Sequence, residues 1–307
     1  MLSFKNFDVI PKVSFVLLSY NQSEYIADAI RAALTQSYEN IEFIFLDDCS
    51  KDNTFKIMTE ISEKSERNIF FESNVKNLGL VGNFNKALSK ASGDIIVVAA
   101  GDDVSLVNRV SETVKLFLEH ENVSFLSFND IKINSNNEEI GRLDKNLMSD
   151  STLTLEQFMQ GQDLCFSGAS RAFKRSLYDI FGDLILNCPT EDTPYRLRGL
   201  MLGNGMVCSS PGIMYRIHDT NLSNASNLAK MNHDLVSAQY EKDINLALDL
   251  NIISMSAATN LTLWCQYILN IKKLAFMSTH FSKYSGYLKL FLKNKYFRAK
   301  VKRHFYK

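Results

Sequence analysis

Several motifs that would assign the chain to a common functional class are missing from its 307 residues. Its five cysteines include no CxxC pair, which disfavours a zinc site or a disulfide framework and favours free thiols in a reducing compartment. No GxGxxG motif follows the first apolar run, which excludes a dinucleotide-dependent dehydrogenase. No GxSxG motif marks a serine nucleophile. The N-terminal segment MLSFKNFDVIPK lacks the apolar stretch of a signal peptide, so we expect a cytoplasmic protein.

Long apolar runs and late acidic residues are also scarce. The stretch Ile252–Leu269 is interrupted by Asn260 and Gln266, which is typical of a core or interfacial helix rather than a membrane span. No Asp or Glu follows Asp249, whereas 11 Lys and Arg residues do, so residues 1–249 carry a compensating net charge of −11. This basic tail is compatible with packing on the rest of the protein or with peripheral binding to anionic lipid. The acidic body argues against nucleic-acid binding.

Short apolar runs alternate with helix-patterned segments over the first two thirds of the chain. The runs expected to form strands are Val13–Leu18, Ile41–Leu46, Ile69–Phe71, Ile95–Ala100 and Val123–Phe128, with shorter ones at Val207–Cys208 and Ile213–Ile217. This alternation predicts an α/β fold with a mostly parallel sheet flanked by helices. From Leu228 onward the pattern is helical. We expect two domains, one at 1–223 and a basic, all-helical C-terminal extension at 224–307.

Some local expectations follow from single residues. Ser23 is suited to cap the helix after the first strand. Gly79 and Gly82 are expected in the loop before the helix that carries Phe84, and Lys174–Phe181 is expected to be helical. Arg198 either lies on a solvated helix face or pairs with an acidic residue of a site.

Three acidic pairs occupy strand ends or helix starts: Asp47 and Asp48, Asp102 and Asp103, and Glu191 and Asp192. For any one pair alone, helix capping is a sufficient explanation. Two strands that both end in Asp-Asp are harder to explain in this way, because carboxylates that converge on one sheet edge repel each other. A divalent cation together with a nucleotide would offset the repulsion. Carboxylate oxygens favour Mg²⁺ or Mn²⁺, which in turn bridge phosphates.

Five segments in series resemble a family-two glycosyltransferase of the GT-A fold. They are VSFVLLSYNQSEYIADAIRAALTQSYENIEFIFLDDCSKDNT, NLGLVGNFNKALSKASGDIIVVAAGDD, FSGASRAFKRSLYDIFG, TEDTPYRLR and YRIHDTNLS. They cover Val13 to about Ser223 in the family's order and spacing. The resemblance implies that residues 1–223 form the nucleotide-sugar-binding and catalytic domain.

The resemblance also implies a role for individual residues. Those expected to bind the nucleotide-sugar are Ser19, Tyr20, Asn21, Asp48, Asn83, Asp102 and Gly168. Tyr20 would stack on the base, and Asp48 would accept from the base imide N–H, which favours a UDP- or dTDP-sugar. Those expected to hold Mn²⁺ or Mg²⁺ are Asp103, Asp102 and His218. A histidine such as His218, taken alone, is more often structural. Its position in the YRIHDTNLS motif favours a role in the active site instead. Asp192 would be the catalytic base and Glu191 its supporting acid.

The implied reaction is inverting transfer of a sugar to a saccharide or a lipid-linked saccharide in cell-surface polysaccharide assembly. The QxxRW signature of processive synthases is absent, so single-residue addition is expected. Two departures motivate an alternative, a non-catalytic sugar-nucleotide-binding or scaffold module. Many relatives carry Asp at the position of Ala100 and Arg at that of Phe84.

Overall fold

The computed structural model describes residues 10–219, 221, 224 and 231–275. The chain divides into two compact units, Met1–Asn221 and Leu222–Lys307, which are considered separately. The first unit contains an eight-stranded sheet, a smaller four-stranded sheet and the helices that cover them.

Four parallel strands form the N-terminal half of the main sheet, in the order β3-β2-β1-β4. Their bounds are β1 (Val13–Ser19), β2 (Ile41–Asp47), β3 (Ile69–Ser73) and β4 (Ile95–Ala100). β1 is buried at every position, because it is central in the sheet and helices cover both of its faces. The four strands agree with the apolar runs that predicted them.

The other half of the main sheet adds the order β10-β6-β11-β9. The bounds are β6 (Val123–Phe128), β9 (Ser151–Leu153), β10 (Ala172–Lys174) and β11 (Asn204–Cys208). β10 runs antiparallel to both of its neighbours, β4 and β6, and β9 runs antiparallel to β11. The prediction of a helix from Lys174 is wrong at its start, because Lys174 ends β10 and α6 begins at Ser176.

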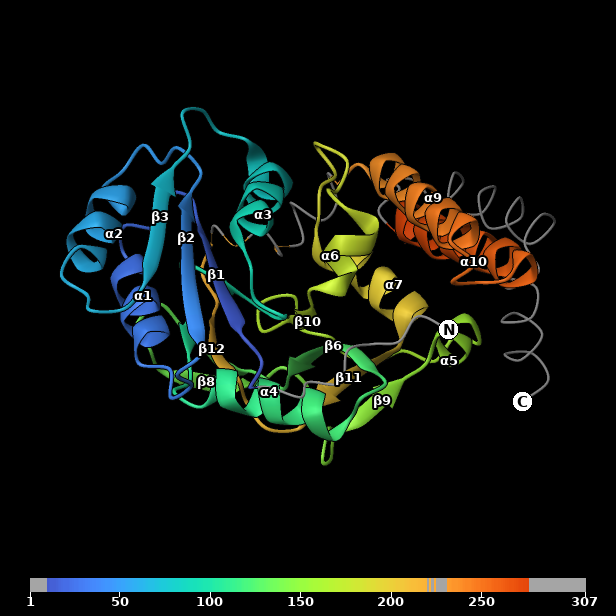
Figure 1. The fold of residues 1–307 in the computed structure, drawn as a ribbon, viewed down its shortest axis with the longest axis horizontal. Helices are drawn as coiled ribbons and strands as arrows, with labels where there is room; N and C mark the ends of the chain where they lie inside the picture. Colours follow the sequence, from blue (N-terminus) through green and yellow to red (C-terminus); the bar gives the residue numbers. More distant parts are fainter. Residues whose placement is uncertain (1–9, 220, 222–223, 225–230, 276–307) are drawn as a thin grey trace. The chain divides into compact units, whose positions relative to one another are not determined.

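Helices cover both faces of the main sheet (Figure 1). One face packs against α1 (Ile26–Leu34), α2 (Thr54–Ser62) and α4 (Arg109–Glu119), whose apolar stripes enter one core with alternate residues of the strands. On the other face are α3 (Gly79–Lys90) and α7 (Asp192–Leu202), with α6 (Ser176–Phe181) packed against α7. A short helix, α5 (Leu155–Met159), follows β9.

Two of the local expectations about helix starts are wrong. Gly79 is the first residue of α3, with a φ of 73°, and Gly82 lies inside that helix rather than in a loop. Ser23 does not cap α1, because the helix begins after Tyr25 without a side-chain cap. The backbone N–H of Ser23 instead donates to Asp52 Oδ2 at 3.0 Å.

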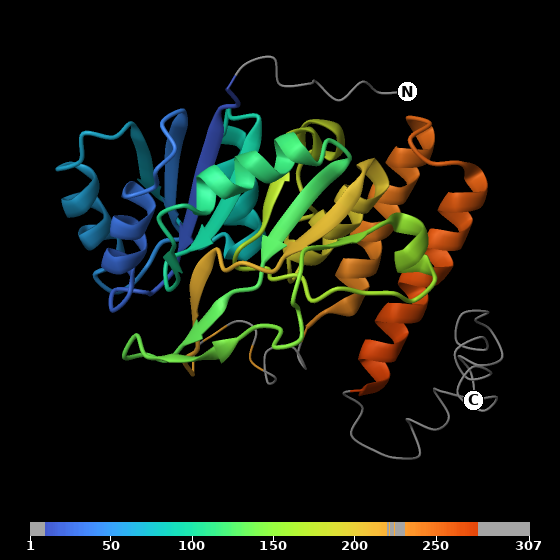
Figure 2. The same ribbon diagram turned by 90° about the horizontal axis from the view of Figure 1, so that it is seen from below.

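The second sheet lies beyond the carboxyl edge of the main one (Figure 2). Its order is β5-β12-β7-β8, with bounds β5 (Val104–Ser105), β7 (Ile131–Ile133), β8 (Glu139–Arg142) and β12 (Ile213–Arg216). β5 closely follows the end of β4, and β7 closely follows the end of β6. The small sheet therefore extends the region where the parallel strands of the main sheet end.

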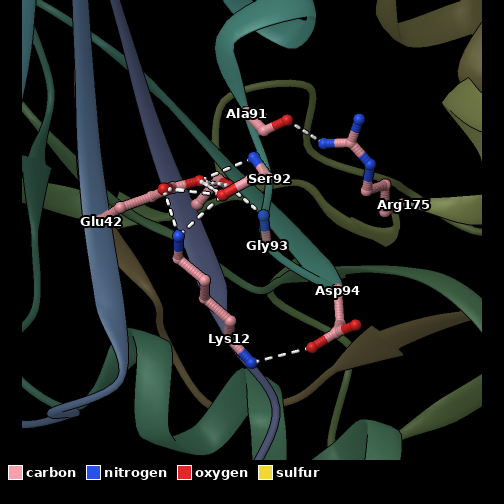
Figure 3. A network of polar contacts seen from close by, with 8 residues as sticks. Lys12, Glu42, Ala91, Ser92, Gly93, Asp94 and Arg175 are labelled. Carbon is pink, nitrogen blue, oxygen red and sulfur yellow. Dashed lines mark hydrogen bonds and ion pairs between the residues drawn. The ribbon is translucent and has the colours of Figure 1, made fainter.

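A polar network ties the strands together at the opposite edge of the main sheet (Figure 3). Glu42 on β2 pairs with Lys12 Nζ at 2.5 Å and accepts from Ser14 Oγ at 2.6 Å. The backbone N–H of Ser92, between α3 and β4, donates to Glu42 at 2.7 Å. One carboxylate thus joins β2, β1 and the connection into β4.

The second unit contains α9 (His233–Asp249) and α10 (Met255–Ala275), which pack against each other. Asn232 caps α9 by accepting from the backbone N–H groups of Asp234 and Leu235. No helix in the described part of the chain is long and apolar enough to cross a membrane. Most of the basic tail, residues 276–307, lies outside the described residues, as does the N-terminal segment 1–9.

Candidate active site

The carboxyl ends of the parallel strands bring the predicted polar residues to one edge. β1 ends at Ser19, β2 at Asp47 and β4 at Ala100, so the residues that follow them lie at the same side of the sheet. β10 runs the other way, so the segment that precedes it, with Gly168 and Arg171, enters from that same edge. The backbone N–H of Val98 donates to Arg171 O at 3.1 Å, which joins this segment to β4.

The two carboxylates of the first acidic pair differ: Asp47 is hydrogen-bonded within the protein, and Asp48 has an oxygen that can accept from a ligand. Asp47 is fully buried and accepts from Ser50 N at 2.9 Å, Ser73 Oγ at 2.7 Å and Ser19 Oγ at 3.4 Å. These bonds satisfy its charge internally. Asp47 therefore shapes the turn after β2, and Ser19, which was expected to meet the nucleotide, uses its hydroxyl to support it.

Asp48 has one oxygen held by the protein and one that is not. Oδ1 accepts from Leu78 N at 2.7 Å and from Asn74 Nδ2 at 2.9 Å. Oδ2 accepts no hydrogen bond from the residues that the structure describes. Asn83 accepts from Asn74 Nδ2 at 2.8 Å and donates to Leu46 O at 3.3 Å. The amide of Asn83 is thus engaged with protein groups at both ends, and it reaches Asp48 through Asn74.

The turn after β1 carries an exposed aromatic ring. Tyr20 is 45% exposed, which leaves its ring accessible for stacking. Asn21 has a φ of 51°, a left-handed conformation that asparagine tolerates better than most residues. Its N–H donates to Ser50 Oγ at 2.8 Å, and its Oδ1 accepts from Lys51 N at 2.8 Å. These bonds lock the turn after β1 to the turn after β2.

The second acidic pair meets the predicted histidine. Asp102 Oδ2 lies 3.0 Å from His218 Nε2, and Asp103 Oδ1 accepts from the backbone N–H of Arg216 at 2.9 Å. Arg216 also donates from Nε to Asp102 O at 2.8 Å, and its guanidinium lies 4.6 Å from the ring centroid of Tyr25. Arg216 is buried, and sequence reasoning missed it although the YRIH motif contains it. Burial and the neighbouring charge of Asp102 raise the pKa of Asp103 well above its usual range.

These residues can be tested as a cation site by the chemistry of their donors. Asp102 and His218 supply a carboxylate and an imidazole within 3.0 Å of each other, with the buried carboxyl group of Asp103 next in sequence. Over the described residues, no group of three or more His, Cys, Asp or Glu side chains has the arrangement of a complete metal site. Asp102 and His218 offer two donor atoms of the kinds that cations accept, and a cation held there would need its remaining ligands from phosphate and water, as Mg²⁺ takes them in phosphate-binding enzymes.

Asp192 opens α7 with one oxygen anchored and the other directed at Gly168. Oδ1 accepts from Thr193 N at 2.5 Å, from Thr193 Oγ1 at 3.0 Å and from Thr190 Oγ1. A Cβ added at Gly168 would lie 2.6 Å from Asp192 Oδ2, so only glycine leaves this oxygen room. Burial alone would raise the pKa of Asp192, but the Arg171 charge and the threonine hydrogen bonds more than offset it and lower the pKa. Asp192 is therefore ionised at neutral pH.

Arg171 supports the third acidic pair, and sequence reasoning missed it. It forms a buried ion pair with Glu191, Nη2 to Oε1 at 2.5 Å, and donates from Nη1 to Gly168 O. Burial raises the pKa of Glu191, the Arg171 charge opposes that rise, and the nearby charge of Asp192 adds to it. Arg171 stands inside FSGASRAF, so the signal was present, but only Gly168 in that motif was assigned a role.

Two further charged groups, Arg109 and Asp130, are buried near the ends of β4 and β6. Arg109 on α4 is buried and donates to Val98 O at 2.6 Å and Ser105 Oγ at 3.0 Å. Asp130, after β6, is fully buried, and burial raises its pKa to about 6 while the charge of Arg109 opposes the rise. Arg109 belongs to the buried stripe of α4, and nothing in the sequence signals that this arginine is buried and bonded to β4 and β5.

Two alternatives left open by the sequence concern Arg198 and Phe84. Arg198 is fully buried, donates to Gly182 O at 2.8 Å and lies over the rings of Tyr195 and Phe181, so the solvated-face alternative is wrong. Phe84 is also fully buried, with its ring 5.1 Å from that of Tyr195 in an edge-on arrangement. The Arg171 guanidinium lies 5.4 Å from the centre of the Phe84 ring.

Comparison with known proteins gives a family match and several relatives. The family model described as Glycosyl transferase family 2 matches residues 14–181. The chain is 34% identical over 131 residues to WfgD of Escherichia coli, a UDP-Glc:α-D-GlcNAc-diphosphoundecaprenol β-1,3-glucosyltransferase. That alignment covers 42% of this chain and 49% of WfgD. The chain spans less than half the length of each of the first curated relatives that it matches.

Solved structures share the fold. S. aureus TarS in complex with UDP-GlcNAc gives a TM-score of 0.60 at 15% identity, over 87% of this chain and 84% of that one. The mannosyltransferase PcManGT from Pyrobaculum calidifontis, in complex with GDP-Man and Mn²⁺, gives 0.58 at 14% identity, over 97% of this chain and 80% of that one. The predicted α/β architecture, a large sheet flanked by helices with C-terminal helices after it, is confirmed.

Proposed function

Because the chain belongs to glycosyl transferase family 2, we propose that it transfers a single sugar from a UDP- or dTDP-sugar to a saccharide or lipid-linked saccharide acceptor, with inversion at the anomeric carbon. The role fits cell-surface polysaccharide assembly. WfgD, whose acceptor is lipid-linked, and TarS, whose structure holds UDP-GlcNAc, support this choice of donor and acceptor classes.

Nucleotide binding is assigned to the turns after β1 and β2. Asp48 Oδ2, which accepts no hydrogen bond from the described residues, is available to accept the imide N–H of uracil or thymine. Cytosine has no such N–H group, so a carboxylate at this position favours the other two pyrimidines. Tyr20 supplies an accessible ring for stacking on the base, and the Asn21 turn keeps the two loops in register.

Catalysis is assigned to Asp192. Its Oδ2 takes the proton from the acceptor hydroxyl as that oxygen attacks C1 of the donor sugar. The C1–O bond to the nucleoside diphosphate breaks, its electrons leave with the diphosphate, and attack from the opposite side inverts the configuration. Arg171 holds Glu191 and lowers the pKa of Asp192, so the base stays ionised. Gly168 leaves space for the reacting hydroxyl beside Oδ2.

A divalent cation, Mn²⁺ or Mg²⁺, would be held by Asp102, Asp103 and His218, and when bound it would supply positive charge to the leaving diphosphate. PcManGT, whose structure holds GDP-Man and Mn²⁺, supports the choice of a divalent cation but not that of its ligands. Arg216 orders the site by fixing the backbone of Asp102 and the carboxyl group of Asp103.

The observation that carries the proposal is the geometry of Asp192, whose Oδ1 is anchored and whose Oδ2 faces Gly168, at the same sheet edge as Asp48 and Asp102. The test measures UDP or dTDP release from a panel of nucleotide-sugars with Mn²⁺, for the wild type and for Asp192→Ala, alongside thermal unfolding with UDP. We expect the wild type to release UDP or dTDP and Asp192→Ala to release neither. Stabilisation by UDP without release from any donor would identify a non-catalytic binding module instead. If the wild type neither releases a nucleotide nor is stabilised by UDP, the proposed nucleotide site is rejected.

A basic tail suits an enzyme with a membrane-bound acceptor. The 11 Lys and Arg residues after Asp249 are unopposed by acidic residues, and positive charge near an anionic bilayer adds about 1 kcal/mol per residue. We assign the tail to peripheral attachment at the cytoplasmic face, where a lipid-linked saccharide would be presented.

A further inference from the structure

A line of hydrogen bonds runs from a partly exposed lysine on α3 to the carboxylate that is proposed to read the base. Lys86 Nζ donates to Asn74 Oδ1 at 2.8 Å. Asn74 follows β3, and its Nδ2 donates to Asp48 Oδ1 at 2.9 Å. Lys86 also pairs with Glu72, on β3, at 2.6 Å. The proposed function gives a role to Asp48 and none to the three residues behind it.

Chemistry fixes the direction of every hydrogen bond in this line. An ammonium group only donates, so Lys86 must face the oxygen of the Asn74 amide. The NH₂ group of Asn74 then faces Asp48. It also donates to Asn83 Oδ1 at 2.8 Å, and the Asn83 amide is oriented in turn by its own donation to Leu46 O at 3.3 Å. Turning the Asn74 amide over would therefore place its oxygen against two other oxygens.

The line is shielded from water where it meets the carboxylate. Asn74, Asn83 and Asp48 are all buried. Hydrogen bonds in such surroundings are stronger than in water, and a misoriented polar group is correspondingly costly. Asp48 Oδ2 has no partner among the described residues, yet it is not one of their fully enclosed unsatisfied atoms. Fixing Oδ1 therefore fixes the direction in which the accessible Oδ2 points.

β3 and α3 anchor the line at its ends. The backbone N–H of Asn74 donates to Asp47 O at 2.8 Å, which joins the turn after β3 to the end of β2. Asn83 and Lys86 are three residues apart on α3 and so lie on one face of that helix. Just before the helix, Leu78 N donates at 2.7 Å to the same carboxylate oxygen that Asn74 holds. The carboxylate is thus oriented by two elements other than the strand that carries it.

A fixed direction is what discrimination between pyrimidines requires. Uracil and thymine carry an N–H at ring position 3, whereas cytosine has a nitrogen lone pair there that would face the carboxylate. A carboxylate that is free to turn can avoid this nitrogen, or accept from the amino group beside it, and so tolerate cytosine. An oxygen that is held in one direction can do neither.

We propose that Asn74 and Lys86 are positioning residues that determine nucleotide specificity, by making Asp48 selective for a base with an imide N–H. Both act through the carboxylate, because their own polar groups are engaged with protein. The inference rests on the proposed function and names the groups that set its choice of pyrimidine.

The experiment measures the dissociation constants of UDP and CDP by calorimetric titration, for the wild type and for variants of the line. The wild type should prefer UDP by about 10²-fold or more, because a site built to bond an N–H group strongly rejects an analogue that lacks it. The ratio of the two dissociation constants is the quantity compared.

Two variants should lower this ratio. Asn74→Ala removes the side-chain bond to Asp48 Oδ1 and should lower the ratio by about 10-fold or more, which is the usual effect of a hydrogen bond to a charged group. Lys86→Met removes the donor that orients the Asn74 amide and should lower it by about 3- to 10-fold. Lys90→Met is the matched control on α3, because Lys90 Nζ lies over the Phe70 ring and outside the line. It should leave the ratio unchanged.

A double-mutant cycle separates positioning from a general loss of structure. If Asn74 acts through the carboxylate, Asn74→Ala should change the ratio in the wild type and not in an Asp48→Asn background. The same change of ratio in both backgrounds overturns the inference, because a distorted fold would act in each. Lys86 is partly exposed, so the cycle can be run with Lys86→Met if Asn74→Ala does not fold.

The outcomes separate this inference from the proposed function. A wild type that binds UDP and CDP equally, or a UDP preference that is unchanged in Asn74→Ala and Lys86→Met, overturns the inference while binding of UDP upholds the nucleotide site. Equal losses of UDP and CDP affinity in both variants also overturn it, since the two residues would then support the fold alone. Failure of the wild type to bind UDP rejects the proposed nucleotide site, and the inference with it.

Discussion

Asp48 and Asp192 divide their carboxylate oxygens in the same way. In each, Oδ1 accepts hydrogen bonds from the protein, from Leu78 and Asn74 in one and from Thr190 and Thr193 in the other. Oδ2 accepts none from the described residues in either. One oxygen thus fixes the direction of the other, which gives a ligand a rigid acceptor without a reorganisation cost.

Asp48→Asn should weaken UDP binding by about 10- to 100-fold, because a hydrogen bond to a charged group contributes roughly 1.5–3 kcal/mol. The asparagine keeps one oxygen for Leu78 and Asn74 but presents an NH₂ group to the base. Calorimetric titration with UDP measures the change. Asp28→Asn on the exposed side of α1 is the control, and an unchanged UDP affinity in Asp48→Asn would show that Asp48 does not read the base.

Gly168→Ala should lower kcat by about 10²-fold, because displacement of a general base removes much of its 10²–10⁴-fold contribution. The new Cβ would lie 2.6 Å from Asp192 Oδ2 and 3.3 Å from its Cγ, so the carboxylate must move. Steady-state kinetics and UDP affinity are measured together. UDP affinity should be retained, and a kcat equal to that of the wild type would contradict the assigned position of the base.

At the scale of elements, the two edges of the main sheet carry different kinds of polar group. The carboxyl edge gathers carboxylates with open oxygens. The amino edge gathers Glu42, Lys12, Ser14 and Ser92 into a network whose groups satisfy one another. The closed network holds β1 and β2 in register, which keeps the turns at the far end of both strands in place. Stability and binding are thus assigned to opposite ends of the same strands.

Glu42→Gln should therefore destabilise the fold in a pH-dependent way. Burial alone would raise the pKa of Glu42, but its bonds with Lys12, Ser14 and Ser92 lower it below the ordinary 4.5. Its stabilising contribution is complete above the unfolded pKa and is lost as the pH falls through the folded one. The variant should be less stable by about 1 kcal/mol at pH 7, and the difference should shrink as the pH falls below 4.5 and through the lower folded pKa.

Urea unfolding at several pH values measures this difference. Glu60→Gln, at an exposed position of α2, serves as the matched control and should show no such trend. A difference between the wild type and Glu42→Gln that is constant from pH 7 to pH 3 would show that the ionised form of Glu42 does not stabilise the fold.

For the whole molecule, charge is distributed unevenly along the chain. The net charge is zero, yet residues 1–249 carry −11 and the remainder +11. Attraction to an anionic surface depends on such local clusters rather than on the net charge, because salt screens charges beyond about 8–10 Å. The acidic part contains the proposed active site, and the basic part contains no acidic residue that would oppose binding to lipid headgroups.

The protein should therefore co-sediment with phosphatidylglycerol vesicles and not with phosphatidylcholine vesicles, and binding should weaken with added salt. Replacing four tail lysines with glutamine should reduce the binding by about 10²-fold or more, at about 1 kcal/mol per charge. The four are Lys293, Lys295, Lys300 and Lys302. The control replaces four exposed lysines of the first unit, Lys56, Lys64, Lys76 and Lys115. Equal losses in both variants would contradict a specific role of the tail.

Local sequence patterns were sufficient to predict the parallel half of the sheet and the polar turns at its carboxyl edge. The runs Val13–Leu18, Ile41–Leu46 and Ile95–Ala100 are long, apolar and followed at once by polar turns, so local pattern was enough to identify them. Because parallel strands end at one edge, the convergence of Asp48 and Asp102 could also be foreseen. Asp192 and His218 were singled out by their motifs, and their roles stay predictions; the structure places His218 Nε2 3.0 Å from Asp102 Oδ2.

The groups that support these residues could not be predicted in this way, because they depend on three-dimensional packing. β5, β7, β8 and β10 have two to four residues, too few for a period to show, and they form because distant strands offer them partners. β12 is the strand of the small sheet that the apolar run Ile213–Ile217 predicted. Arg171 and Arg216 are buried, although arginine in a sequence usually indicates surface. Their partners, Glu191 for one and Asp102 for the other, lie 20 and 114 residues away along the chain. Contacts at such separations are set by packing of the whole domain, which no local pattern encodes.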